Sequence, residues 1–538
     1  MKKNLSLSHY HILFLFFVFV SINVSAQDCT PPDKTAEISV NNIRALLKTN
    51  GAHFFDGTGS QFEVPKGSGK TSLFSGALWL GAMDEQDKLH VAAMRFGQDG
   101  NDYFAGPISN DVSVSSVYDK FWHITKEEID AHKAHYADPN YSVPNNILSW
   151  PAHGRTQYGE SSYLAPYKNV SGQAKYSPQL GDYPEIRGDE AILFIQNDDC
   201  YHTESMGSKL GVEILGMMYA YDADKVELSN TIFLSYTIRN KSANNYQDLY
   251  IGFFSDFDIG FAEDDYVGCD STLNLGYGYN GKPVDGSGES HAYGDNPPAQ
   301  GVMFLNQKMS AFMYFTRTSG PTIPIYIFPS IECYRYLRAY WSNEVPLTYG
   351  GTGYNPASTD TTKYAFSGDP ETGTGWTEVN AGNTPYDRRG VLSAGPFTLS
   401  ANESICIDIA LPWARSTQGY LNSVTLLKES AQAIQQFYNQ QNYVDYCNFP
   451  VGIKEIENNF DIQVYPNPAK NELRVTSYEL QVTNVEVFDV YGRKQKAESR
   501  KQKAESEMVL DISHLSAGVY FIRISTEKGV VNKKVVKY

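Results

Sequence analysis

The chain is poor in cysteine, in long apolar runs and in catalytic motifs, and each shortage excludes a kind of site or segment. Only six of its 538 residues are cysteine, and none stands in CxxC or another zinc-ligand spacing, so no zinc site is expected. After residue 26 no stretch reaches 18 apolar residues, so the sequence predicts no membrane span. There is no GxSxG motif and no cysteine with an evident base, so the sequence offers no catalytic residues.

Positive charge is scarce. The chain has 44 Lys and Arg against 61 Asp and Glu, a formal net charge of −17. The imbalance is concentrated in residues 27–460, where 29 Lys and Arg face 51 Asp and Glu, a net −22. A region this acidic repels phosphate backbones and anionic lipid, so nucleic acid is not expected as a partner.

Aromatic residues are abundant, with 38 Tyr and 28 Phe, and they occur in alternating segments. Residues 225–242 and 246–260 read as the two strands of a hairpin, and residues 395–415 read as a second hairpin that turns at 400–402. Two helices are expected, one over residues 126–136 with Thr125 as its N-cap and one over residues 417–440. The sequence therefore predicts a mainly β fold, a large antiparallel β-sandwich-type body with a few helices.

The first 26 residues have the pattern of a secretory signal peptide. Lys2 and Lys3 precede an apolar run over residues 12–20, and small residues precede Gln27. The β-rich body is expected over residues 27–450, with a division into two subdomains, near 27–185 and 186–450, left open. Residues 451–460 are polar and read as a linker.

Residues 461–538 read as a separate small β module. Alternating apolar positions flank the turn Pro466-Asn467-Pro468, and further short strands are separated by glycine turns. The run YPNPAKNELRV, VFDVYGRK, LSAGVYFIRI and KKVVKY resembles the type A C-terminal sorting domain of the type IX secretion system of Bacteroidetes. The resemblance implies a small immunoglobulin-like β-sandwich that is a partner of the secretion machinery.

That resemblance also implies a destination. The protein would pass through Sec export and the periplasm, then cross the outer membrane to the cell surface or the medium, with the tail removed. The body, through phrases such as LWLGAMD, RFGQDGNDY and DRRGVLSAGPFTL, resembles uncharacterised exported Bacteroidetes proteins, a likeness that implies no activity.

One segment, FFSDFDIGFAEDDYVGCDS, concentrates acidic residues. Closely spaced carboxylates on a glycine-punctuated loop are suited to calcium, so the segment is a candidate structural Ca²⁺ site, although its spacing is not that of an EF-hand. The alternative is a solvated acidic loop. The candidate metal ligands are Asp256, Asp258, Asp264, Asp265 and Asp270.

Cysteine pairing stays open. An even number of cysteines in an exported protein allows disulfides, with 15 connectivities for six residues. Cys29 and Cys447 bracket the body and could tie its ends together. The alternative is that several cysteines are buried free thiols.

The body is expected to be a binding, adhesion or structural module at the cell surface. Four tryptophans in Gly/Pro-rich loops could stack on a glycan, or could instead anchor the loops to the core: Trp122, Trp150, Trp341 and Trp376. The alternative function is a secreted hydrolase of polysaccharide or protein, because pairs of carboxylates for such chemistry cannot be recognised without their separation in space.

Overall fold

The computed structural model describes residues 29–316, 329–441, 443, 447, 462–477, 482–489, 494–495, 498–501, 507–526 and 529–538. The expected signal peptide and the linker 451–460 lie outside these residues. The chain divides into two compact units, Met1–Phe449 and Pro450–Tyr538, the body and the tail. No helix in the described part of the chain combines the length and apolarity needed to cross a bilayer.

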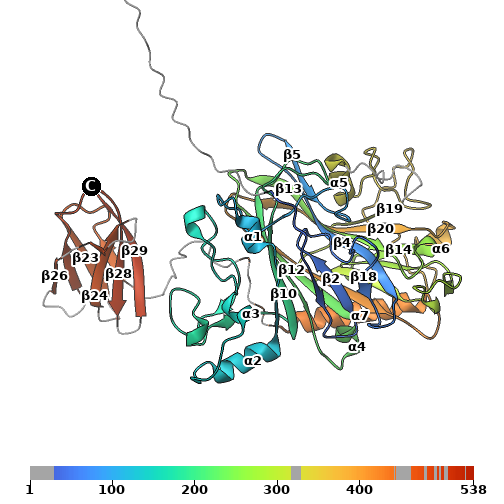
Figure 1. Cartoon of the computed structure of the whole chain (residues 1–538). Coiled ribbons are helices and arrows are strands. Elements are labelled where there is room, and N and C mark those ends of the chain that lie inside the picture. The colour runs from blue at the N-terminus through green and yellow to red at the C-terminus, as the bar shows by residue number, and fades with distance from the viewer. Residues whose placement is uncertain are drawn as a thin grey trace, which may run out of the picture. The chain divides into compact units, whose positions relative to one another are not determined.

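Two antiparallel sheets form the body (Figure 1). The first sheet has eight strands in the order β1-β2-β3-β4-β13-β20-β19, with β5 also paired to β4. Its strands are β1 Thr35–Ile38, β2 Arg44–Lys48, β3 Phe62–Glu63, β4 Thr71–Met83, β5 Leu89–Ala93, β13 Tyr246–Phe257, β19 Ala311–Thr316 and β20 Arg388–Leu399.

The second sheet has nine strands in the order β14-β15-β18-β21-β12-β11-β10-β6, with β7 also paired to β10. Its strands are β6 Phe104–Ala105, β7 Trp122–Thr125, β10 Glu190–Asn197, β11 Val212–Ala220, β12 Thr231–Asn240, β14 Asp265–Asp270, β15 Leu275–Asn280, β18 Ala299–Phe304 and β21 Ser404–Ala414. Two further pairs are small, β8 Tyr167–Lys168 with β9 Tyr183–Pro184, and β16 Val284–Asp285 with β17 Gly294–Asp295.

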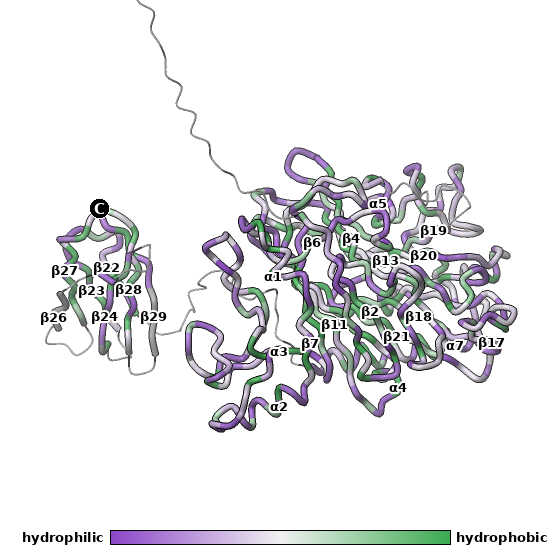
Figure 2. Tube along the Cα trace, viewed as in Figure 1, coloured by the Kyte–Doolittle hydropathy of each residue, from purple (hydrophilic) through white to green (hydrophobic). Residues whose placement is uncertain are grey.

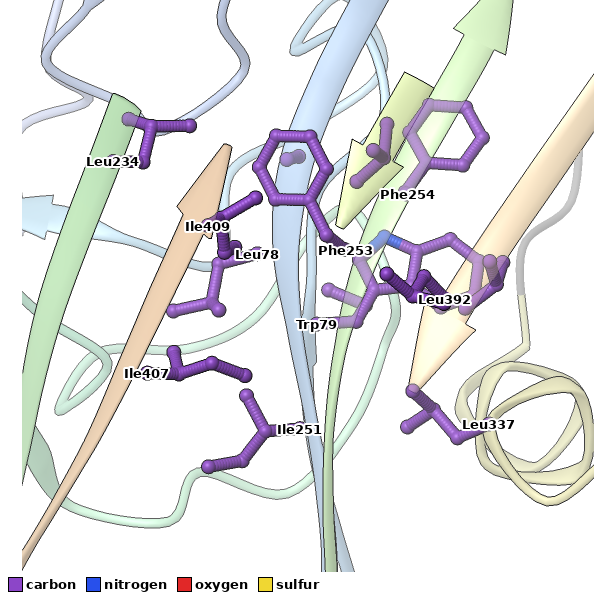
Figure 3. Close-up of a cluster of buried hydrophobic side chains, with 14 of the residues drawn as sticks. Leu78, Trp79, Leu234, Ile251, Phe253, Phe254, Leu337, Leu392, Ile407 and Ile409 are labelled. Carbon is purple, nitrogen blue, oxygen red and sulfur yellow. The ribbon is translucent and has the colours of Figure 1, made fainter. Parts of the chain in front are cut away.

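A continuous apolar core fills the space between the two sheets. Ile251 and Phe253 of β13 belong to one buried cluster with Ile407 and Ile409 of β21 (Figure 3). The neighbouring residue on β13, Phe254, points to the opposite face, as the two-residue period of a strand requires. The central strands are therefore buried on both faces, and hydrophobic residues are frequent along the strands of the body (Figure 2).

Helices cover the outer faces of the two sheets. The longest, α7, places its apolar stripe on the second sheet. Leu337 of α5 lies so close to the first sheet that a side chain at Gly252 would meet it at 2.3 Å, which explains the glycine there. The helices are α1 Val114–Tyr118, α2 Lys126–His135, α3 Asn145–Leu148, α4 Val226–Ser229, α5 Ser330–Leu337, α6 Glu378–Ala381 and α7 Asn422–Asn439, with 3-10 turns η1 Thr156–Tyr158, η2 Pro178–Leu180 and η3 Ala262–Asp264.

The mainly β, antiparallel fold with few helices is confirmed, as are both predicted helices. At the start of α2 the Thr125 hydroxyl accepts a hydrogen bond from the Glu128 backbone at 3.2 Å, and the Glu128 carboxylate accepts one from the Thr125 backbone at 2.8 Å. This reciprocal capping box satisfies two backbone donors at the helix terminus.

Both predicted hairpins are wrong. Strand β12 pairs with β11 and β21 in the second sheet, whereas β13 pairs with β4 and β20 in the first. Likewise β20 lies in the first sheet and β21 in the second. Residues 226–229, expected to extend β12, form helix α4. Consecutive strands thus cross between sheets, a connection that sandwich folds allow and alternation cannot reveal.

Strands from both halves of the body share sheets, so the body is one unit rather than two subdomains near residue 185. In the first sheet β4 pairs with β13 along most of its length. In the second, β6 and β7 pair with β10.

The cysteines pair within the body. Disulfides join Cys29 to Cys200 and Cys406 to Cys447. The suggested Cys29–Cys447 pair is therefore wrong, since each end of the body is tied to an interior segment instead. Cys269 and Cys333 are buried free thiols.

The tail consists of two four-stranded antiparallel sheets, in the orders β22-β23-β27-β26 and β25-β24-β28-β29. Its strands are β22 Ile462–Tyr465, β23 Glu472–Ser477, β24 Val482–Asp489, β25 Lys494–Gln495, β26 Glu498–Lys501, β27 Glu507–Asp511, β28 Gly518–Thr526 and β29 Gly529–Lys537. Leu473, Val475, Leu510 and Ile524 are central members of its aliphatic core. The small C-terminal β domain is confirmed.

Candidate functional site

Two of the five predicted metal ligands lie together at the end of β13, an interior strand of the first sheet. Asp256 is the penultimate residue of β13, and it pairs across the ladder with Arg389 of β20. Continuing this antiparallel register by two residues places Asp258 opposite Asp387. Side chains two residues apart in a strand share a face, so both pairs project on the same side of the sheet.

The three carboxylates converge. One oxygen from each of Asp256, Asp258 and Asp387 lies within 4.8 Å of the other two, and this is the group of possible metal ligands found among the described residues. Asp256 is 2% exposed and Asp387 is 6% exposed, whereas Asp258 is partly exposed. Burying three like charges so closely requires compensation.

Arg389 supplies part of that compensation. Its Nε lies 3.3 Å from Asp256 Oδ2, and its Nη2 donates a hydrogen bond to Asp387 Oδ2 at 3.0 Å. Its guanidinium also lies 5.9 Å from the centre of the Phe96 ring, in a cation–π contact. A single guanidinium thus holds two of the three carboxylates.

The compensation is incomplete. Oδ1 of Asp256 and Oδ1 of Asp387 are both buried and have no hydrogen-bond partner. Burial raises the pKa of Asp256 to about 7, against the lowering effect of Arg389. Burial, followed by the charges of Asp256 and Asp387, holds the pKa of Asp258 well above its ordinary value. Because the ionised forms of these carboxyl groups are destabilised by burial, a cation that entered beside them would stabilise them.

A cavity of about 670 Å³ opens onto this acidic centre. Its wall combines the three aspartates and Arg389 with three phenylalanine rings, from Phe74 of β4, Phe315 of β19 and Phe96 of the segment that follows β5. The rings of Phe74 and Phe96 are 5.8 Å apart, and both are partly exposed. The cavity therefore presents charged and aromatic surfaces side by side.

A second arginine supports the same wall. Arg95 lies 3.3 Å from Glu204 and 3.7 Å from Asp99, and its guanidinium is 5.9 Å from the Phe96 ring. Phe96 is thus in contact with two guanidinium groups, which limits how far the ring can move.

The other three predicted ligands lie outside the acidic centre. Asp264 accepts a hydrogen bond from the Gly286 backbone at 3.3 Å, and Asp265, fully buried, accepts one from the Ile259 backbone at 2.9 Å. Asp270 accepts hydrogen bonds from both the backbone and the hydroxyl of Thr272. These carboxylates hold the turns around β14.

Asp387 was missed by the sequence interpretation. It is distant in sequence from the acidic segment and stands in Asp387-Arg388-Arg389, at the start of β20. One signal was available in the sequence. Asp258 lies two residues after Asp256, and Asp387 lies two residues before Arg389, the cross-strand partner of Asp256. Using it required knowing that β13 and β20 are neighbours.

The four tryptophans proposed as a sugar-stacking platform are core residues. Each is 3–4% exposed and donates its indole N–H to a backbone carbonyl, at distances of 2.6 to 3.0 Å. Trp122, Trp150, Trp341 and Trp376 therefore anchor loops, and the partly exposed aromatic surface beside the acidic centre comes from phenylalanines.

A second cavity, of about 960 Å³, lies beside the Cys29–Cys200 disulfide. Its wall includes Lys88, Lys209, Lys241 and Tyr201. Lys209 is engaged with Asp199 at 2.6 Å. No group of three possible metal-ligating side chains occurs there among the described residues, so it lacks the convergent charge of the first cavity.

Comparisons with known proteins separate the tail from the body. Residues 463–538 match the family model of the secretion system C-terminal sorting domain. No curated protein matches the chain.

Two solved structures are distantly similar. A polysaccharide lyase is 7% identical over 66% of this chain, with a TM-score of 0.20, and the chain spans 37% of its length. A candidate aldose 1-epimerase from Escherichia coli K12 is 9% identical over 71% of this chain and 99% of its own, with a TM-score of 0.23. Scores this low carry no argument about the body.

The tail match, by contrast, agrees with both the motifs and the fold. A domain of this family directs its protein through the secretion machinery to the cell surface or beyond. Residues 463–538 are a type IX secretion C-terminal sorting domain, and the chain that carries it is a secreted protein.

Proposed function

We propose that the body is an extracellular binding module, serving adhesion or ligand capture at the cell surface, and that its ligand is a glycan held in the acidic cavity. The observation that carries the proposal is the wall of that cavity, where carboxylates and a guanidinium lie beside phenylalanine rings. Its volume falls in the range of small-ligand sites.

Sugars suit such a surface because they carry both kinds of complementary group. Their hydroxyls donate to carboxylates and accept from guanidinium groups, while their C–H faces pack on aromatic rings. Here Asp258 is the partly exposed carboxylate, Arg389 is the donor and Phe96 is the ring. The overall negative charge favours a neutral or amino sugar over an acidic one.

The proposed route to the surface begins with the signal peptide of residues 1–26, followed by Sec export and passage through the periplasm. The sorting domain then engages the type IX machinery. Attachment to the surface or release into the medium would follow removal of the tail.

Binding to a glycan array, followed by calorimetry with any sugar retained, tests the ligand proposal on the purified full-length protein. The variant Phe96→Ala is expected to weaken binding at least tenfold, because it removes the ring from the wall. Tyr201→Ala, which changes a 71% exposed ring at the second cavity, serves as the matched control and should bind normally. Absence of binding, or equal effects of the two variants, contradicts the proposal.

A secreted hydrolase is the second candidate, because the acidic centre pairs carboxylates at a catalytically useful distance. In retaining glycoside hydrolases the two carboxyl groups are about 5–5.5 Å apart. One oxygen of each of Asp256, Asp258 and Asp387 lies within 4.8 Å of the other two. Release of reducing ends from a polysaccharide panel, abolished by Asp258→Asn but retained by Asp270→Asn, would favour hydrolysis over binding. Intact polysaccharides after prolonged incubation would exclude it for the panel.

A further inference from the structure

We propose that Asp256, Asp258 and Asp387 bind one Ca²⁺ ion at the floor of the cavity. The site lies where β13 ends and β20 begins, and it differs from the calcium loop expected from the sequence because its third ligand, Asp387, directly precedes β20. It concerns a metal and not the glycan, so it stands or falls independently of the proposed ligand.

The distances fit a calcium ion. Ca²⁺–oxygen bonds are about 2.3–2.6 Å, so two oxygens bound to the same ion lie up to about 5 Å apart. The three carboxylate oxygens are within 4.8 Å of one another. An all-carboxylate donor set is hard, which favours Ca²⁺ or Mg²⁺ over zinc or copper. Mg²⁺ demands shorter bonds and near-octahedral geometry, so calcium is the better match.

The charge also fits a divalent ion. With an ion bound and all three aspartates ionised, the aspartates and Arg389 carry a formal charge of −2. Arg389 occupies Oδ2 of Asp256 and lies at hydrogen-bond distance from Oδ2 of Asp387. The site is therefore charge-balanced by one Ca²⁺ and not by a second guanidinium, since Arg95 is already engaged by Glu204 and Asp99.

An independent observation points to a bound cation. Oδ1 of Asp256 and Oδ1 of Asp387 are buried without any hydrogen-bond partner, on side chains at least nine-tenths buried. Buried polar atoms almost always have partners, because leaving one unpaired costs the full desolvation of the group. Both atoms belong to residues of the cavity wall, so an ion entering the cavity can satisfy them together.

The opening of the cavity leaves room for further ligands of the ion. Calcium takes six to eight oxygens. Because Arg389 holds Oδ2 of Asp256 and of Asp387, the three carboxylates supply three or four of them. The remaining positions face a space of about 670 Å³ that admits water or the hydroxyls of a bound molecule. The ion would then be part of the binding surface, a consequence that does rest on the proposed function.

Calorimetric titration of the full-length, chelator-treated protein with CaCl₂ tests the site directly. The expected result is one Ca²⁺ per chain and a melting temperature that rises with calcium and falls with EGTA. Asp258→Asn and Asp387→Asn should each weaken binding at least tenfold. Asp270→Asn is the control, an acid of the same segment outside the cluster, and should bind normally. Wild-type protein that binds no Ca²⁺, or unchanged binding in both cluster variants, overturns the proposal.

A gain in affinity guards against variants that lose binding through misfolding. Arg389→Gln removes the internal counter-charge and changes the cluster from −2 to −3. Calcium affinity should therefore increase several-fold, and the melting temperature should depend more steeply on calcium than in the wild type. If Arg389→Gln folds and binds calcium no more tightly than the wild type, the three aspartates are not the ligands.

Discussion

The body and the tail are both antiparallel β units, but the body buries many charged side chains and the tail buries few. The body buries charged side chains deep in its fold, among them Asp256, Glu204 and Arg388. In the described residues of the tail the core is aliphatic, and Lys537 is the one charged side chain that is buried. Net charge follows the same division, since residues 461–538 carry 13 Lys and Arg against 10 Asp and Glu, whereas the rest is strongly acidic.

This difference fits a tail that is a sorting domain and a body that is the proposed ligand-binding unit. Burying a charge costs several kcal/mol unless it is paired, so buried charges are expected where they form internal ion pairs or bind a ligand. A sorting domain needs a stable fold, which an aliphatic core supplies, and an exposed surface for the secretion machinery. The ligand chemistry of this protein should therefore be sought in the body, and specifically where buried charges remain unpaired.

The largest expected effect tests whether the tail directs export without being needed for the body to fold. Deletion of residues 461–538 should abolish appearance of the protein at the cell surface and in the medium, leaving it in the periplasm with a folded body. Immunoblots of fractionated cells measure this, and melting of the retained protein reports on its fold. Undiminished export of the truncated chain, or a body that no longer folds, would break the separation.

The next effect should be confined to the body, because all six cysteines lie there. Cys29–Cys200 closes a sequence separation of 171 residues and Cys406–Cys447 one of 41. Each bridge is expected to contribute about 2–4 kcal/mol by restricting the unfolded chain, with the longer loop at the upper end. Reductant should lower the melting temperature of the body and leave that of the tail unchanged. Calorimetry with and without reductant measures both.

The variants Cys29→Ser and Cys406→Ser apportion the disulfide effect. Each should reproduce part of the reductant's effect under oxidising conditions, with the larger loss for Cys29→Ser. A tail transition that also moves would show that the two units do not unfold independently.

The same contrast explains what the sequence could predict. In the tail, neighbouring segments carry local turn signals, such as Pro466-Asn467-Pro468, and the family motifs are contiguous. The helix α7 was predictable because its buried residues, including Val424 and Leu427, recur at helical spacing. Asp256 and Asp258 were recognisable as a pair because they lie two residues apart in the sequence, at the end of an alternating segment.

Strand partners in the body were not predictable from one sequence. β12 and β13 are buried on both faces, so neither pattern shows which sheet the strand enters. For the same reason the contribution of Asp387 was hidden, since it depends on the register of β20 against β13. Cysteine pairing is likewise a property of three-dimensional neighbours, which is why Cys200 and not Cys447 is bonded to Cys29.

A smaller effect should appear as a pH dependence of the body alone. Burial raises the pKa of Glu204 from 4.5 to about 7, opposed by Arg95 and assisted by Asp102 and Asp99. Between these values the folded protein keeps a proton that the unfolded chain loses. Its contribution to the free energy of unfolding therefore falls as pH rises, by up to about 1.4 kcal/mol per pH unit.

Denaturant unfolding between pH 5 and 7 checks this dependence. Glu204→Gln should flatten the slope of the body transition, and the difference from the wild type isolates Glu204 from the other buried acids. The tail transition should show no such slope. A variant with the wild-type slope would mean that Glu204 is ionised in the folded body throughout this range.

The smallest expected effect concerns a single helix start at the surface of the body. Thr125→Ala removes the hydroxyl that accepts the Glu128 backbone N–H, and with it half of the capping box of α2. The free energy of unfolding of the body should fall by about 1 kcal/mol. Thr125→Ser keeps the acceptor and should restore most of the loss. Because α2 packs on β7 and β9 and contributes nothing to the acidic cavity, calcium and ligand binding should be unchanged in both variants. If Thr125→Ala loses calcium or ligand binding, the cavity is coupled to the distant start of α2, and the body does not confine a local change.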